Sequence, residues 1–318
     1  MTARPSADLS LREGSLGDLR VTFDVAHVAV AETARRMGVQ QDETGEQALE
    51  ADWQSHRELL EFIVTGQGGQ YWVCEDAGVI VGYGRVCRFG EMEELTELMV
   101  LPSHQGRGIG RALLERCWPG DPSPDMGRVV VAAGASTDLS LYAGFGVMPT
   151  AGHWHLRARR SGYQESRSQE TDVAEPAVHV LEAERAVSEW NRLEPRAIGH
   201  RRPMLHEFFS RRRTCLAIMD EETGRATALC WVGSRCDIGP AVAATPEELV
   251  PVVLAALDRV AKTKEPESLG VFCATDSWWV LRRLRGLGFR VHWPSWIMAS
   301  VPLPGLDRYL PTRPPHLL

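Results

Sequence analysis

In this chain of 318 residues, one order of predicted strands and helices occurs twice. In residues 70–158 and again in residues 215–301, a hairpin is followed by a strand, a helix, a strand, a short helix and a last strand. Gly146 and Gly288 stand at the same place in the two successions, 142 positions apart. An internal repeat of this kind requires two copies of one structural unit, even where residue identities have diverged. We therefore expect two tandem domains of one architecture.

Each copy favours a mixed sheet. Strands outnumber helices, and an antiparallel hairpin comes before a strand–helix–strand unit. Hairpin strands beside a parallel pair predict a mixed sheet with helices packed on its faces. The expected fold class is therefore α/β with a mixed α+β sheet, built twice.

A polar segment at residues 159–176 separates the two copies and has no aliphatic residue before Val173. Such composition is typical of linkers, although a long hairpin inside one domain would have the same composition. We expect a first domain over residues 8–163, a second over residues 176–302, and a Pro-rich, extended tail over residues 303–318.

Composition and charge narrow the range of partners. The chain has a net charge of −7, seven cysteines without a Cys-x-x-Cys pair, and no apolar run of membrane-spanning length. Net negative charge disfavours nucleic acid, and scattered cysteines are typical of reduced thiols rather than of disulfides or a zinc site. We expect a cytoplasmic protein that uses no metal and binds neither nucleic acid nor a membrane.

The stretch HQGRGIGRALLERCW, residues 104–118, carries the strongest functional signal. Gly106, Gly108 and Gly110 stand directly before an amphipathic helix, although glycine lowers helix stability. The first N–H groups of a helix lack partners and carry partial positive charge, and glycines let a phosphate approach them. The Walker consensus is absent, and Arg111 replaces the third glycine of a dinucleotide-binding fingerprint. A tight strand-to-helix turn is the alternative interpretation.

Residues 97–114, ELMVLPSHQGRGIGRALL, form one recognisable element, and residues 141–147, LYAGFGV, form a second. They resemble the strand, pyrophosphate loop and helix, and the Leu-Tyr-x-x-x-Gly-Phe element, of the GNAT superfamily of acyl-CoA-dependent N-acetyltransferases, with Val147 in place of phenylalanine. The resemblance implies that acetyl-CoA or another acyl-CoA binds with its pantetheine arm along a strand. The implied coenzyme-binding residues are Leu98, Met99 and Val100 for that arm, and Gln105, Gly106, Arg107, Gly108, Ile109, Gly110 and Arg111 for the pyrophosphate.

Acyl transfer to an amine requires a base and an acid. An alkylamine with a pKa near 10 is only about one-thousandth neutral at pH 7, and only the neutral form attacks a thioester. The resemblance implies Tyr142 as the acid that protonates the leaving thiolate, with a simple packing role as the alternative. For the base it implies Glu94, with Glu93, Glu97 or a bound water as rivals. Strand alternation places Glu93 and Glu97 on one side and Glu94 with Thr96 on the other.

The second copy lacks both elements. In GPAVAATPEELVPV, residues 239–252, Thr245, Pro246 and Glu248 predict an N-cap, a first-turn proline and a capping box in place of a glycine loop. Leu284 is the counterpart of Tyr142 and cannot donate a proton. We interpret this copy as degenerate, shaping an acceptor pocket or stabilising the fold. The tandem arrangement is similar to that of mycothiol synthases, whose intact site lies in the second half, so no substrate is carried over.

Taken together, these features predict an N-acetyltransferase that acts on a primary amine, with a small molecule favoured as acceptor. No cysteine stands out as a covalent relay, which favours direct attack within a ternary complex. Two alternatives are a protein that binds acyl-CoA without turnover, and an enzyme of this fold that performs O-acyl transfer or decarboxylation. The acceptor, the acyl chain and the oligomeric state are not predicted.

Overall fold

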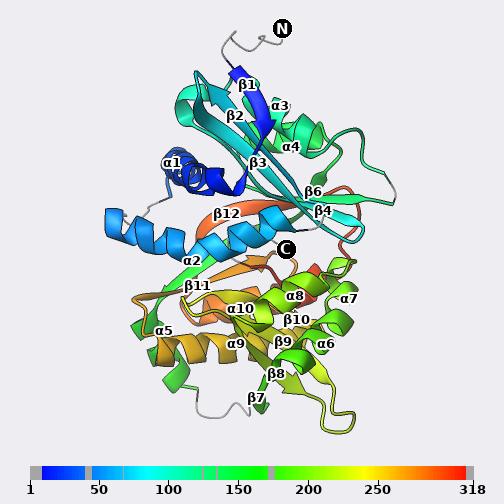
Figure 1. Ribbon diagram of the computed structural model, residues 1–318. Helices are drawn as coiled ribbons and strands as arrows, with labels where there is room; N and C mark the ends of the chain where they lie inside the picture. The colour runs from blue at the N-terminus through cyan, green and yellow to red at the C-terminus, as the bar shows by residue number, and fades with distance from the viewer. Residues whose placement is uncertain are drawn as a thin grey trace. The chain divides into compact units, whose positions relative to one another are not determined.

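The chain forms two compact units, Met1–Met148 and Pro149–Leu318. The computed structural model describes residues 9–39, 45–66, 68–123, 125–133, 135–170 and 176–312 (Figure 1). Within these ranges every helix is too short or too polar to span a lipid bilayer.

The first unit is built on five strands in the order β1, β2, β3, β4 and β5. β1 to β4 pair antiparallel, and β5 runs parallel to β4. The β2–β3 hairpin turns at Ala77 and Gly78, whose φ angles of 49° and 81° suit a type I′ turn. The strand bounds are β1 Leu9–Glu13, β2 Gln70–Asp76, β3 Val79–Phe89, β4 Met92–Val100 and β5 Gly127–Ala132.

Helices cover both faces of this sheet. α1 and α2 pack on one face, where Leu19 of α1 joins a core around Tyr71 and Tyr83. α3 packs on the other face through Leu113, which contacts a cluster that includes Val81. α4 lies beside α3 (Figure 1). The bounds are η1 Leu16–Asp18, α1 Leu19–Met37, α2 Glu46–Thr65, η2 Pro102–His104, α3 Ile109–Cys117 and α4 Ser136–Ala143.

The second unit contains one sheet in the order β13, β10, β9, β8, β7 and a further group of strands in the order β12, β6, β11. Helix α9 contributes more residues than any other element to the central core, among them Leu257. The strand bounds are β6 Met148–Arg159, β7 Val178–Leu181, β8 Thr214–Met219, β9 Ala226–Val232, β10 Ile238–Ala243, β11 Ser268–Ala274, β12 Arg290–Ala299 and β13 Tyr309–Leu310. The helix bounds are α5 Arg160–Ser168, α6 Ala183–Leu193, α7 Pro195–Ile198, α8 Pro203–Ser210, α9 Pro246–Thr263, α10 Trp278–Gly286 and η3 Leu306–Arg308.

The mixed α/β fold class is confirmed, and the units divide at a different place from the sequence repeat. The last strand of the first repeat, β6, pairs antiparallel with β11 in the second unit. The limits 8–163 and 176–302 therefore stay a prediction about the repeat, whereas the compact units divide at Met148. In the expected tail, η3 and β13 are ordered elements, and residues 313–318 lie outside the described part.

The polar segment between the repeats packs as part of the second unit. It forms helix α5, in which Tyr163 is only 1% exposed and lies edge-on to Phe289, with 5.9 Å between ring centroids. The Tyr163 hydroxyl donates to Asp258 Oδ1 at 2.6 Å, and Arg167 pairs with Asp258 Oδ2 at 2.8 Å. One buried ring and its polar partners suffice to hold a helix of polar composition. Residues 171–175 of the segment lie outside the described chain.

We expect Tyr163→Ala to lower the free energy of unfolding by about 3–5 kcal/mol, because it removes a buried aromatic side chain from the core. Denaturant unfolding measures this change. Glu165→Ala on the exposed side of the same helix is the control, with an expected change within about 0.5 kcal/mol. Equal effects of the two substitutions would contradict the packing of α5 on the second unit.

Candidate functional site

Strand β4 carries a β-bulge at Thr96, next to its central residues. Leu95 lies opposite Val86 of β3, and Glu97 lies opposite Arg85, so three residues of β4 face two of β3. The bulge shifts the alternation of side chains by one position beyond this point.

The bulge places Glu94 and Glu97 on the same face of the sheet. Glu94 lies opposite Cys87 and Glu97 opposite Arg85, and these two β3 residues are two positions apart. The Arg85 guanidinium bonds to Thr22 of α1, so this is the face that α1 and α2 cover. The predicted alternation, which separated Glu94 from Glu97, was wrong because it assumed an unbulged strand.

Two of the three candidate glutamates face arginines. Glu97 Oε2 accepts from Arg85 Nη1 at 2.5 Å, and its other oxygen accepts from the Tyr83 hydroxyl at 3.1 Å. Glu93 Oε2 lies 3.5 Å from Nε of Arg128. Both arginines are buried, with side chains 1% and 4% exposed. Each of these carboxylates therefore balances a buried positive charge.

Glu94 lies where β4 and β5 separate. It is 1% exposed and stands opposite Val129 of β5. In the described part of the chain, the parallel pairing of the two strands ends one position later, at Leu95 and Val130. β4 continues on β3 as far as Val100, so an open edge begins after Leu95, one residue beyond Glu94.

The open edge of β4 presents the backbone groups of alternate residues. Leu101 N donates to Val81 O of β3 at 2.8 Å, which identifies the residue pairs that bond across the β3–β4 ladder. It follows that Met99 directs its N–H and C=O toward β3, while Leu98 and Val100 direct theirs away from it. The groups that face the edge therefore belong to Leu98 and Val100, and of these the Val100 carbonyl accepts a hydrogen bond from Gln105 Nε2 at 3.0 Å.

The glycine stretch forms an open loop at the start of α3. Gly106 and Gly108 have φ angles of 76° and 84°, a region that disfavours side chains, so the turn itself requires both glycines. A Cβ at either position would meet no heavy atom within 4 Å, so the space above the loop is open. Gly108 is the N-cap, and no side chain in the described ranges caps the helix. The first N–H groups of α3 thus face open space.

The third glycine has a different role from the first two. Gly110 lies inside α3, and an added Cβ would make an ordinary contact of 3.6 Å with Leu141 Cδ2 of α4. Neither its backbone conformation nor its surroundings therefore require glycine at this position.

Side chains hold the loop from two directions. Gln105 Nε2 donates to Val100 O at 3.0 Å, and Arg36 Nη1 of α1 donates to Gln105 Oε1 at 2.9 Å. Arg107 Nη1 donates to Asp76 Oδ2 at the β2–β3 turn over 3.3 Å. The loop is therefore tied to the end of β4, to α1 and to the hairpin.

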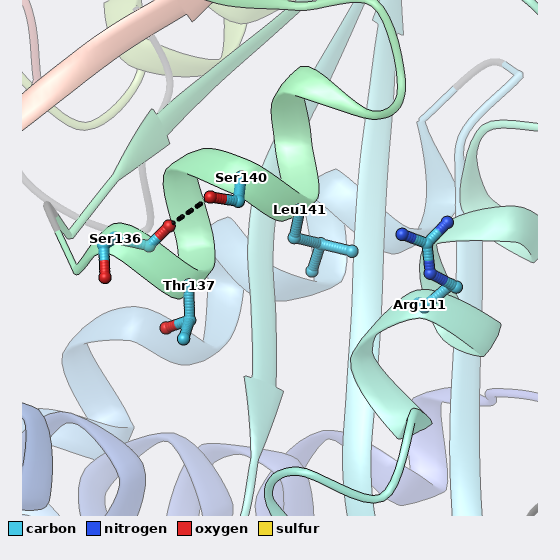
Figure 2. Close-up of a pocket in the computed structure, with 5 residues that line it drawn as sticks. All are labelled: Arg111, Ser136, Thr137, Ser140 and Leu141. Carbon is cyan, nitrogen blue, oxygen red and sulfur yellow. Dashed lines mark hydrogen bonds between the residues drawn. The ribbon is translucent and has the colours of Figure 1, made fainter. Parts of the chain in front are cut away.

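A pocket of about 410 Å³ opens beside this loop, between the first turn of α3 and helix α4. Figure 2 shows Leu141 of α4 pointing toward Arg111 of α3, with the hydroxyl side chains of Ser136, Thr137 and Ser140 farther along α4. Ser140 Oγ donates to Ser136 O at 2.7 Å. A cation beside hydroxyl groups suits an anionic ligand that also carries hydrogen-bonding groups. The lining residues are Arg111, Ser136, Thr137, Ser140 and Leu141.

Tyr142 follows Leu141 on α4 and points inward. It is 7% exposed, and its hydroxyl makes no hydrogen bond within the described ranges. Burial raises the pKa of the Tyr142 phenol well above its usual range, and the negative charge of Asp138 raises it further. The phenol is therefore protonated at neutral pH, as a proton donor must be.

In the second unit, side chains cap the N-terminus of the equivalent helix, α9. Thr245 N and Thr245 Oγ1 lie 3.1 and 3.0 Å from Glu248 Oε2, in the predicted capping box at the start of α9. Leu284, the counterpart of Tyr142, is fully buried in the core. The capping box is confirmed, and the start of α9 is occupied by the protein's own groups.

Comparison with known proteins finds a family match for one stretch of the chain. The model of the acetyltransferase (GNAT) domain matches residues 67–146, which hold the hairpin, β4, the glycine loop and α4. This stretch of the first unit is therefore similar to a GNAT acetyltransferase domain. No curated protein sequence matches the chain.

Solved structures extend the likeness in fold to nearly the whole chain. A putative acetyltransferase from Pyrococcus horikoshii aligns with a TM-score of 0.69 and 16% identity, over 95% of this chain and 93% of that one. A tandem GNAT protein from the clavulanic acid biosynthesis pathway aligns with a TM-score of 0.56 and 16% identity, over 92% and 99%. A GCN5-related N-acetyltransferase from Sphaerobacter thermophilus gives 0.53 and 15%, over 95% and 98%. At these identities the likeness shows a tandem GNAT fold.

The glycines of the loop predict opposite effects of one substitution. Gly108→Ala places a side chain at a left-handed φ and should destabilise the protein by about 1–2 kcal/mol. Gly110→Ala lies inside a helix with ordinary contacts and should be neutral or stabilising by up to about 1 kcal/mol. Chemical denaturation of both variants checks this, and equal losses would contradict the described loop.

Proposed function

We propose that the first unit transfers an acyl group from acetyl-CoA, or another acyl-CoA, to a primary amine of a small molecule. The observation that carries this proposal is the open edge of β4, which leads into a glycine loop and an uncapped helix. An extended amide chain can pair with the strand edge, and a diphosphate at its end can lie on the N-terminus of the helix.

The residues present fit coenzyme A group by group. The pantetheine amides would pair with the N–H and C=O of Leu98 and with the N–H of Val100, as an added strand does. The pyrophosphate would lie on the amides of residues 105–111, where the absence of β-carbons at Gly106 and Gly108 leaves room. Arg111 supplies a positive charge beside them. The same edge amides would polarise the thioester carbonyl near Val100.

The reaction removes two protons from the ammonium nitrogen and supplies one to the leaving thiolate. A base takes the first proton, and the neutral nitrogen attacks the thioester carbon. As the C–S bond breaks, the nitrogen loses its second proton to water, the thiolate gains a proton from the acid, and water reprotonates the acid. Holding amine and thioester in line supplies much of the rate.

Glu94 is the preferred base. Protonating Glu97 would leave the buried charge of Arg85 unbalanced, which is costly, and the same holds for Glu93 beside Arg128. Glu94 instead stands at the point where β4 and β5 part, next to the open edge on which the thioester would lie.

Tyr142 is the preferred acid. Its phenol is protonated at neutral pH, and it stands on α4, the helix that follows β5 in the chain. A hydrogen bond from this hydroxyl would stabilise the thiolate as it leaves.

The setting that we infer is cytoplasmic, with an organic amine rather than nucleic acid as the partner. The net charge of −7 favours a cationic substrate over a polyanion. The seven cysteines, all of which lie in the described part of the chain, form no disulfide, which fits a reducing compartment.

Tyr142→Phe should reduce turnover about 100-fold or more, because it removes the proton donor while keeping the ring. The measurement is free-thiol release from acetyl-CoA across a panel of amines, with coenzyme A binding to the variant as the control. Unchanged rates would remove Tyr142 from the mechanism. Coenzyme binding without thiol release for any amine would indicate a binding protein instead.

Glu94→Gln should lower kcat about 100-fold at neutral pH while leaving coenzyme A affinity unchanged, because the base acts on the amine alone. Glu97→Gln should instead lower stability by about 3–5 kcal/mol, since it leaves Arg85 buried without its counter-charge. Steady-state kinetics and thermal unfolding of both variants separate the two roles. A large kcat loss confined to Glu97→Gln would identify Glu97 as the base.

A further inference from the structure

We propose that the second unit has its own equivalent of the coenzyme groove, and that the chain's C-terminal segment, residues 305–312, permanently occupies it. The segment takes the position that the first unit offers to the arm of acyl-CoA. The comparison of the two grooves rests on the proposed function, whereas the occupation of the second groove stands on its own contacts.

Each unit has a hydrogen bond at the same place in its fold, and this pair of bonds allows the ends of the equivalent strands to be compared. In the first unit Leu101 N, just after β4, donates to Val81 O at 2.8 Å. In the second unit Ala244 N, just after β10, donates to Thr227 O at 2.7 Å. Each bond joins the end of a strand to the second strand of the preceding hairpin, and each lies before the loop that leads to a helix.

Counting back three residues from each bond makes Leu98 of β4 equivalent to Ala241 of β10. Leu98 directs its backbone groups to an open edge. Ala241 instead lies opposite Leu310 of β13, and Val242 lies opposite Tyr309, in an antiparallel pairing. The edge that is open in the first unit is therefore closed in the second by the chain itself.

A peptide segment is a suitable occupant of such a groove because pantetheine and a peptide both carry amides along an extended chain. Each can pair with a strand edge by the same backbone hydrogen bonds. The second unit also binds the segment from the side of α10, the counterpart of α4. Ser277 Oγ, at the N-cap of α10, lies 2.7 Å from Leu306 O and 2.9 Å from Tyr309 O.

The segment is anchored in the core of the second unit. Tyr309 and Leu310 are fully buried, and Leu306 and Thr312 are 3% and 1% exposed. Side chains that are buried to this degree cannot leave without exposing the core. This contrasts with a ligand, which must enter and leave.

The Tyr309 hydroxyl joins a buried ionic cluster. It donates to Glu194 Oε1 at 3.2 Å and accepts from Arg202, and Glu194 Oε2 lies 2.6 Å from His206 Nε2. Burial alone would raise the pKa of Glu194, but Arg202 and His206 lower it to about 2. Removing the segment would take a hydrogen-bond partner from this buried charge, which is costly. The occupation is therefore permanent, and one chain binds one acyl-CoA.

Hydrogen exchange on the full chain, with and without coenzyme A, tests this directly. In the free protein we expect the amide of Leu98 to exchange rapidly and that of Ala241 to be strongly protected. Coenzyme A at 100 times its dissociation constant should slow exchange at Leu98 by about 100-fold and leave Ala241 unchanged. Titration calorimetry should give one coenzyme A per chain.

A pair of conservative variants tests the anchor. Tyr309→Phe removes a hydroxyl bonded to charged groups and should speed exchange at Ala241 by about 10- to 100-fold. Tyr163→Phe, which loses the bond to Asp258 elsewhere in the same unit, is the matched control and should leave Ala241 unchanged.

Three results would overturn the proposal: rapid exchange at Ala241 in the free protein, slowing of that exchange by coenzyme A, or two coenzyme molecules per chain. If coenzyme A leaves Leu98 unaffected while Ala241 is protected, the proposed function of the first unit fails. The occupied groove of the second unit is then supported on its own.

Discussion

The separation of β4 from β5 after Leu95 is the constraint on which the rest of the structure depends. A strand edge carries N–H and C=O groups that need partners, because leaving them buried and unpaired is costly. In the first unit the backbone groups of Leu98 point away from β3 along the open edge, and Val100 O accepts a hydrogen bond from the Gln105 side chain. In the second unit the equivalent edge is paired with β13. The equivalent strand edges of the two units thus differ: the edge of β4 is open after Leu95, and the edge of β10 is paired with β13.

The bulge at Thr96 links this edge to the chemistry. It brings Glu94 and Glu97 to one face, where Arg85 balances Glu97. The Arg85 guanidinium lies 4.9 and 4.5 Å from the ring centroids of Tyr71 and Tyr83, so its charge is held by cation–π contacts as well as by the carboxylate. Because that arrangement consumes Glu97, the site that we propose assigns proton removal to Glu94.

The N-termini of α3 and α9 differ in the same way as the two strand edges: only that of α9 is occupied by the protein's own side chains. α3 begins at Gly108 with open space over its first N–H groups, whereas α9 begins with the Thr245–Glu248 capping box. Strand edge and helix start form the two ends of one groove, and in the second unit both are filled by the protein's own groups. In our proposal, the second unit does not bind coenzyme A because internal pairing occupies its groove, while its fold is kept.

The sequence by itself determined the local features: the mixed α/β class, the hairpin turn at Ala77 and Gly78, the loop glycines and the capping box. Each depends on conformational preferences of a few neighbouring residues, which a sequence displays directly. Only the tertiary structure decided the face of Glu97, the packing of Tyr163, the pairing of β6 with β11 and the place of β13. These depend on strand register and on partners far along the chain, and a one-residue bulge or a distant strand leaves no local pattern to identify it.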